Sequence, residues 1–111
     1  MSKLKEMTAE MFEAEVLKSP IPVLIDFHAV WCGPCKASAP ALEDAAKEFE
    51  GEIAFVKVDV DQQPSLAKQF DVQGVPTFVI VKDGQPVERF QGLVSRGKLA
   101  TMLEPFVEDA Q

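Results

Sequence analysis

The sequence of 111 residues lacks a long hydrophobic run. No stretch approaches the roughly 20 apolar residues that a membrane-spanning helix needs, and the opening segment, MSKLKEMTAEMF, has no apolar run of the length found in secretory signals. We therefore expect no association with a membrane and a location in the cytosol. Nothing in the sequence supports a periplasmic or secreted location.

Basic residues are also scarce. The chain carries 11 lysines and arginines against 18 aspartates and glutamates, which gives a formal net charge of −7 at pH 7. Phosphate backbones repel such a surface, so nucleic acid is not an expected partner. Hydrophobic residues make up 47% of the chain, which is enough for a core, and the length predicts a single domain over residues 1–111.

Helical and strand patterns alternate along the chain. Apolar residues at helical spacing and capping residues such as Thr8 and Ser95 predict helices over residues 8–18, from 32 or 34 to 49, over 64–70 and over 95–107. Short apolar runs between turn residues predict strands over residues 23–27, 53–60, 77–81 and 87–92. The segment before residue 8 leaves room for one more strand. Pro40 lies inside the second helix and predicts a kink there.

The order of these elements predicts an α/β fold. Strand, helix and strand in succession form a βαβ unit, so strands 23–27 and 53–60 should be parallel. Asp83-Gly84 between the last two strands is a favoured two-residue hairpin turn, so those strands should be antiparallel. A mixed sheet with helices on both faces satisfies both conditions.

Only two cysteines are present, and both lie in the segment AVWCGPCK, residues 29–36. Helix positions i and i+3 bring β-carbons to roughly 5–6 Å, close to the distance that a disulfide needs. The loop that this bridge closes is very short, so the bridge restricts the unfolded chain little. A bond between Cys32 and Cys35 therefore suits reversible opening and closing better than stability.

The place of the pair between a strand and a helix predicts two different roles. Cys32 opens the helix, where free backbone N–H groups and the helix dipole favour a thiolate. Cys35 lies one turn further in, and we expect it to be the more shielded sulfur. Cys32 would attack a substrate disulfide, and Cys35 would then resolve the mixed disulfide. Gly33 and Pro34 set the turn that brings the two sulfurs together.

Two other interpretations of the pair stay open on these residues alone. One is a zinc site, for which Cys32, Cys35, His28 and Asp26 could just make a set of four ligands. Structural zinc usually takes four protein ligands, and the chain has one histidine and no second cysteine pair. The other interpretation is an inert buried pair.

Several motifs lie in the order and spacing of one protein family. WCGPC follows the strand VLIDF, and the motifs KVDVD, GVPTFVIVKDGQ and FQG come after it, the last ending at Gly92. Together they resemble the thioredoxin family over nearly the whole chain. The resemblance implies a thioredoxin fold, with a central mixed β-sheet of about five strands flanked by about four helices.

The resemblance also implies an activity. The expected function is that of a general protein disulfide reductase that works by dithiol–disulfide exchange, and Gly33-Pro34 between the cysteines favours the reducing direction. No metal and no cofactor are expected beyond the redox-active disulfide Cys32-Cys35. Expected partners are disulfide-containing proteins and a thioredoxin reductase, either flavin-dependent or ferredoxin-dependent. We expect a monomer.

Two charged residues with apolar strand neighbours take roles by the same resemblance. Asp26 resembles the buried aspartate that helps to take the proton from the second cysteine, and burial should raise its pKa toward neutrality. Lys57 resembles the lysine that pairs with this aspartate. The residues alone leave open a solvated Asp26 at the end of its strand and a Lys57 that extends to water.

The resemblance places a flat, mostly apolar docking face around the cysteines. Its residues are Trp31, Gly33, Pro34, Val75, Pro76 and Gly92, with Val60 as a further candidate. Pro76 resembles the family's cis-proline, beside which the backbone of Val75 can pair with a substrate peptide like an added strand. Gly92 leaves room for a substrate chain, although these glycines could also serve turn geometry alone.

Two positions depart from the family pattern. His28 stands where family members usually carry an aromatic residue, and an imidazole can titrate near neutrality. We expect a modest effect on local packing and on the Cys32 thiolate; the alternative is a partly exposed histidine without a redox role. Gln91 is more polar than the small apolar residue often found before Gly92, which concerns the choice of partners rather than the chemistry.

Two competing functions remain. One is a disulfide oxidase or isomerase, which a more oxidising redox potential would reveal. The other is a thioredoxin-fold interaction subunit of a larger complex, which would use the same docking face without turnover. The presence of both cysteines argues against a purely structural role.

Overall fold

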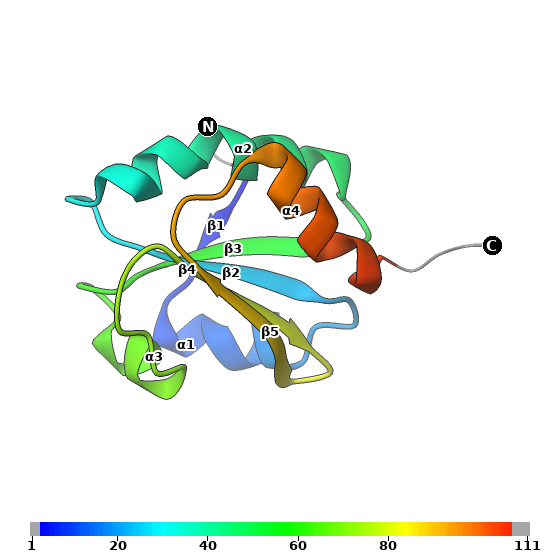
Figure 1. Cartoon of the computed structure of the whole chain (residues 1–111). Helices are drawn as coiled ribbons and strands as arrows, with labels where there is room; N and C mark the ends of the chain where they lie inside the picture. The colour runs from blue at the N-terminus through cyan, green and yellow to red at the C-terminus, as the bar shows by residue number, and fades with distance from the viewer. Residues whose placement is uncertain (1–2, 108–111) are drawn as a thin grey trace.

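A computed structural model of the chain describes residues 3–107. These residues hold one five-stranded sheet in the order β1-β3-β2-β4-β5. Helices α2 and α4 cover one face of the sheet, and α1 and α3 cover the other (Figure 1). The predicted α/β fold with a central mixed sheet is confirmed.

The strands lie close to their predicted positions. They are β1 (Lys5–Glu6), β2 (Val23–His28), β3 (Ala54–Asp59), β4 (Thr77–Lys82) and β5 (Gln85–Gln91). β3 is parallel to β1 and β2, whereas β4 is antiparallel to β2 and β5. The short strand β1 occupies the place left for one more strand. In the β4–β5 turn, Asp83 and Gly84 both have positive φ (53° and 79°), as a type I′ hairpin turn requires.

The helices depart from prediction mainly at their ends. They are α1 (Ala9–Phe12), α2 (Gly33–Glu48), α3 (Pro64–Gln69) and α4 (Arg96–Leu103). The first predicted helix continues as a π-helix, η1 (Glu13–Leu17), and the last one changes into a 3-10 turn, η2 (Glu104–Phe106). Pro105 has no N–H with which to bond the carbonyl of Thr101, so α-helical bonding cannot continue through it.

The two predicted caps have different outcomes. Ser95 caps α4 as expected, because its Oγ accepts a hydrogen bond of 3.2 Å from the N–H of Lys98. Thr8 lies at the N-cap position of α1, but its side chain makes no capping hydrogen bond. The N–H of Ala9 donates instead to Oε1 of Gln63, over 3.1 Å. A distant side chain therefore satisfies this end of the helix.

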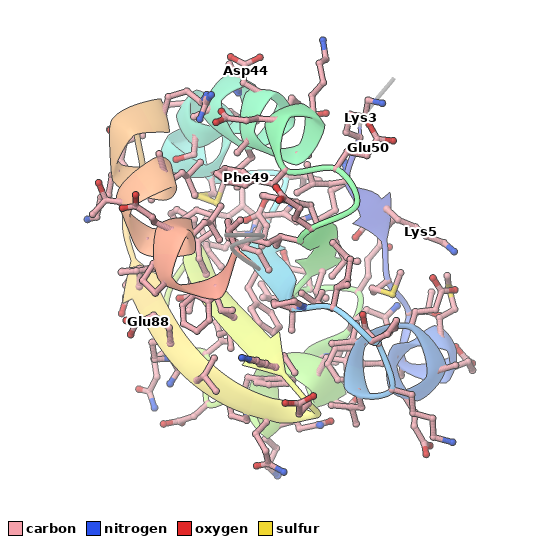
Figure 2. All side chains as sticks on the ribbon, turned by 90° about the vertical axis from the view of Figure 1, so that its right-hand side faces the viewer. Lys3, Lys5, Asp44, Phe49, Glu50 and Glu88 are labelled. Atoms are coloured by element: carbon pink, nitrogen blue, oxygen red, sulfur yellow. A yellow bond between two sulfur atoms is a disulfide. The ribbon has the colours of Figure 1, made fainter. Side chains whose placement is uncertain are left out.

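Alternation along the strands divides the core into two layers. Leu24 packs with Phe78 on the side of α2 and α4, whereas Phe27 packs on the side of α1 and α3. Phe49, which follows α2, points into the first layer, while the side chain of Lys5 projects away from β1 (Figure 2). Residues two apart share a face of a strand. Asp26 and His28 therefore lie on the side of Leu24, beneath α2.

Candidate redox-active site

A disulfide joins Cys32 to Cys35, whose Cα atoms are 5.3 Å apart. Cys32 is the N-cap residue of α2, and Gly33 and Pro34 begin the helix. The N–H of Cys35 donates a hydrogen bond of 3.1 Å to Sγ of Cys32. The first turn of α2 therefore points a donor at this sulfur, which would favour its thiolate once the disulfide opens.

Both cysteines are buried in the disulfide form. The exposed fraction is 3% for Cys32 and 8% for Cys35, so the prediction that Cys35 is the more shielded residue is wrong for this state. Both pack with Ala29, Val60 and Val75 in a small apolar cluster. Of the two, Cys35 also lines a cavity. The hydrogen bond to Sγ of Cys32, rather than burial, distinguishes the two sulfurs.

The cavity beside Cys35 has a volume of about 160 Å³ and a partly charged wall. Asp26 and His28 line it from β2, and Lys57 lines it from β3. α2 adds Cys35, Lys36 and Glu43 to the same wall. Asp26 and Lys57 are also partners in the parallel ladder of β2 and β3. The structure thus brings the two charged residues named by the resemblance to Cys35.

Asp26 is buried, with an exposed fraction of 7%, so the alternative of a solvated carboxylate is excluded. Its Oδ1 makes no hydrogen bond to the part of the chain that the structure describes. Burial raises the pKa of Asp26 from 3.8 to about 6, while His28 and Lys57 lower it and Glu6 raises it. A carboxyl group with such a pKa can accept and release a proton close to neutral pH.

Residues of the expected docking face differ in exposure. Trp31, Gly33 and Pro34 are exposed, and Val75 and Gly92 are partly exposed. The Val75-Pro76 peptide bond is cis, as expected, but Pro76 itself is buried. Its carbonyl accepts a hydrogen bond of 2.9 Å from the N–H of Gly92. Pro76 therefore joins two loops of the face from beneath and offers little surface of its own.

Sequence reasoning missed several residues of this region. Val30 and Leu93 are large apolar residues with exposed fractions of 67% and 59%, and each is the chain neighbour of an expected face residue. Asp61 belongs to the motif KVDVD, yet no role was expected for it. Glu6, which lies 3.6 Å from His28, carries no motif at all. Val30 is close to Cys32 in the sequence, whereas only the fold shows that the other three residues lie in this region.

The structure of residues 3–107 shows no assembled metal site. Across residues 3–107, no group of three or more histidine, cysteine, aspartate and glutamate side chains is placed to hold a metal ion. Cys32 and Cys35 are bonded to each other, so neither offers a thiolate in this form. The set of four zinc ligands left open by the sequence is therefore not formed.

Comparison with known proteins gives consistent matches. Residues 3–105 match the family model described as Thioredoxin. Thioredoxin 1 of Nostoc sp. is 42% identical over 104 residues, which cover 94% of this chain and 97% of the relative. Thioredoxin of Mycobacterium tuberculosis is 46% identical over 99 residues, or 89% of this chain and 84% of the relative. A bifunctional thioredoxin reductase/thioredoxin of Mycobacterium leprae is 45% identical over 97 residues, or 87% of this chain and 21% of that protein.

Proposed function

The chain belongs to the thioredoxin family and is a thiol–disulfide oxidoreductase, and on that premise we propose the part that each residue takes in disulfide reduction. In the dithiol form, the Cys32 thiolate attacks one sulfur of a substrate disulfide. The substrate S–S bond breaks as the mixed disulfide forms. The first substrate sulfur leaves as a thiolate and takes a proton from water.

Cys35 completes the exchange. Its thiol gives a proton to the Asp26 carboxylate, and its sulfur attacks Sγ of Cys32. The mixed disulfide breaks, the Cys32–Cys35 bond forms, and the second substrate thiolate leaves and is protonated. Two electrons have then passed from the two cysteines to the substrate. The sulfur pair holds these electrons itself, and thioredoxins work in this way without a separate cofactor.

The observation that best supports these roles is the cavity shared by Cys35 and Asp26. A proton acceptor next to the resolving thiol is what the second step needs, and burial gives Asp26 a pKa of about 6. Lys57 stands beside Asp26 in the ladder and supplies the positive charge that favours the carboxylate once the proton has left. The proposed proton acceptor is therefore Asp26, with Lys57 as its partner.

We propose that substrates bind to the docking face, here defined as Trp31, Gly33, Pro34, Val75 and Gly92, with Pro76 beneath it. The exposed apolar surface of Trp31 provides the contact area. A substrate segment would pair with the backbone beside Val75. The exposed side chains of Val30 and Leu93 extend the same surface.

The proposed partners are proteins with accessible disulfides and a thioredoxin reductase. The M. leprae relative supports the second partner, because its name joins the two activities in one chain. We further propose that the protein works in the cytosol as a monomer of one domain, which sedimentation at micromolar concentration would test. Within residues 3–107, no helix has both the length and the apolar character to cross a membrane.

The test of the reaction is reduction of insulin disulfides by dithiothreitol, with and without the protein. The parent chain should accelerate it, and Cys32→Ser should not. Cys35→Ser should form the mixed disulfide and fail to release it, so that a covalent adduct appears in mass spectrometry. Equal rates for the parent and Cys32→Ser, or no adduct with Cys35→Ser, would contradict the assignment.

A further inference from the structure

His28 lies two residues from Asp26 on the same face of β2, and both side chains line the cavity beside Cys35. Glu6 of β1 approaches His28 from the far side of β3, since the strand order is β1-β3-β2. Its Oε2 lies 3.6 Å from Nε2 of His28. A pair of side chains that can carry opposite charges therefore lies next to the proposed proton acceptor.

The three side chains differ in their access to water. Asp26 is buried, the side chain of His28 is 18% exposed, and that of Glu6 is 45% exposed. Nε2 of His28 is itself buried and makes no hydrogen bond within residues 3–107. The imidazole of His28 thus lies between the buried carboxyl group of Asp26 and the solvent-exposed carboxyl group of Glu6. Charges in such a place are screened less than charges at the surface.

Other charged groups also face His28. Asp59 is its ladder partner on β3, but Oδ1 of Asp59 accepts hydrogen bonds from the N–H groups of Asp61 and Gln62 (2.9 and 3.3 Å). Lys57 lies between Asp26 and Glu6, as the ladder partner of both.

Helix α2 contributes Lys36 and Glu43 to the same cavity wall. Imidazole is the ordinary side-chain type whose charge changes around neutral pH, and among these neighbours of Asp26 only His28 carries one. It is also the single histidine of the chain.

We propose that His28, held by Glu6, is a positioning residue that sets the charge of Asp26 and thereby the pH range in which Cys35 can lose its proton. A protonated His28 favours the Asp26 carboxylate, so Asp26 can accept the Cys35 proton at lower pH than it could beside an uncharged residue. His28 touches no substrate and acts through Asp26. The proposal rests on the proposed role of Asp26 as proton acceptor.

The interaction of Asp26 with its neighbours has the sign that this proposal requires. His28 lowers the pKa of Asp26 more than Lys57 does, although burial outweighs both. Glu6 raises the same pKa. Both members of the pair are therefore close enough to act on the charge of Asp26.

The first test is an NMR titration of the Asp26 carboxyl carbon in the parent and in His28→Gln. Glutamine keeps a polar side chain but carries no charge. The parent signal should titrate in two coupled steps, and the variant signal in one. The acid dissociation constant of Asp26 should fall about threefold to tenfold in the variant, as expected when one nearby positive charge is removed. An unchanged titration curve would overturn the proposal.

The second test measures the step itself. The dithiol protein is mixed with excess disulfide substrate, and closure of the disulfide is followed by the fluorescence of Trp31, the only tryptophan. In His28→Gln, the acidic limb of the pH–rate profile should move to higher pH by the same factor, while the plateau rate stays unchanged. A lower plateau with an unmoved limb would show a packing effect and overturn the proposal.

Three further variants separate the possible failures. Glu10→Gln, an exposed carboxylate of α1 on the other face of the sheet, is the matched control for Glu6→Gln and should change neither measurement. Glu6→Gln should shift the Asp26 titration by different amounts in the parent and in His28→Gln, and equal shifts would remove Glu6 from the proposal. If Asp26→Asn keeps the full rate of closure, the proposed proton acceptor fails; if it is slow while His28→Gln matches the parent, only the role of His28 fails.

Discussion

Nε1 of Trp31 donates a hydrogen bond of 2.8 Å to Oδ2 of Asp61. This bond joins the segment before Cys32 to the turn after β3, although Trp31 is 67% exposed. An indole has one polar atom, so a single acceptor can fix the orientation of a large apolar surface. Trp31 is thereby oriented before any substrate arrives, and if substrates bind to the proposed docking face, this should reduce the entropy lost on binding.

Asp61→Ala should release the indole of Trp31. Because the bond is at the surface, the free energy of unfolding should fall by only about 1 kcal/mol. The steady-state anisotropy of the tryptophan fluorescence should fall clearly, and it reports on Trp31 alone. Asp61→Asn keeps an oxygen acceptor and is the control. If Asp61→Ala has the anisotropy of the parent, the bond does not hold the ring in solution.

Ser38→Ala should destabilise the protein although it removes one atom. Ser38 is fully buried in α2, and its Oγ accepts a hydrogen bond of 3.1 Å from the N–H of Val94. Without this acceptor, a buried N–H loses its partner, which costs about 1–3 kcal/mol of unfolding free energy. Chemical denaturation measures the loss. Thr101→Ala removes an exposed hydroxyl and should change the value by less than about 0.5 kcal/mol; equal effects would contradict the prediction.

Gly92→Ala and Gly33→Ala should differ strongly, although neither added methyl group meets an atom within 4 Å. Gly92 has a φ of +103°, a conformation that an alanine adopts only with about 1–3 kcal/mol of strain. Gly33 opens α2 with no such constraint, and alanine there should cost less than about 0.5 kcal/mol. Thermal or urea unfolding of both variants compares them directly. A Gly92→Ala variant as stable as Gly33→Ala would show that the loop relaxes.

Asp26→Asn should increase the unfolding free energy of the disulfide form, relative to the parent, more at neutral pH than at acidic pH. Burial raises the pKa of Asp26 from 3.8 to about 6, so between these values the folded protein holds a proton that the unfolded chain has lost. The stability of the parent therefore decreases as pH rises through this window. The difference in unfolding free energy between variant and parent should grow in favour of the variant by about 3 kcal/mol from about pH 4 to about pH 7. Urea unfolding across this range measures it, and a constant difference would show that the carboxyl is ionised without penalty.

Local patterns in the sequence were enough to predict most of the strands and helices. The apolar run around Asp26 could be identified as a buried strand, and Asp83-Gly84 as a two-residue turn, because each depends on neighbours in the chain. The parallel arrangement of β2 and β3 followed from the βαβ order, whereas the pairing of Asp26 with Lys57 was implied by the family resemblance. The spacing of Cys32 and Cys35 predicted the disulfide, and the family resemblance supplied the expected role of Asp26. The end of α4 could also have been foreseen from Pro105.

Features that depend on distant contacts could not be foreseen. Glu6 lies in a strand of two residues, which is too short for an alternating pattern. It approaches His28 only because β1 and β2 are the two neighbours of β3 in the sheet. Cys35 lines a cavity whose wall comes from several elements. Spacing along the chain predicts which residues share a face, but not how tightly the layers close over them.

The β4–β5 turn at Asp83-Gly84 stands at the end of the sheet remote from the cysteines, because β4 starts next to Pro76 and runs away from it for 6 residues (Figure 1). Six residues of strand span roughly 20 Å. A fluorophore, an affinity tag or a fused enzyme attached at the exposed Asp83 would leave the docking face uncovered. The chain can thus be tethered to a surface or joined to a second protein by this turn while its sulfurs still reach their substrates.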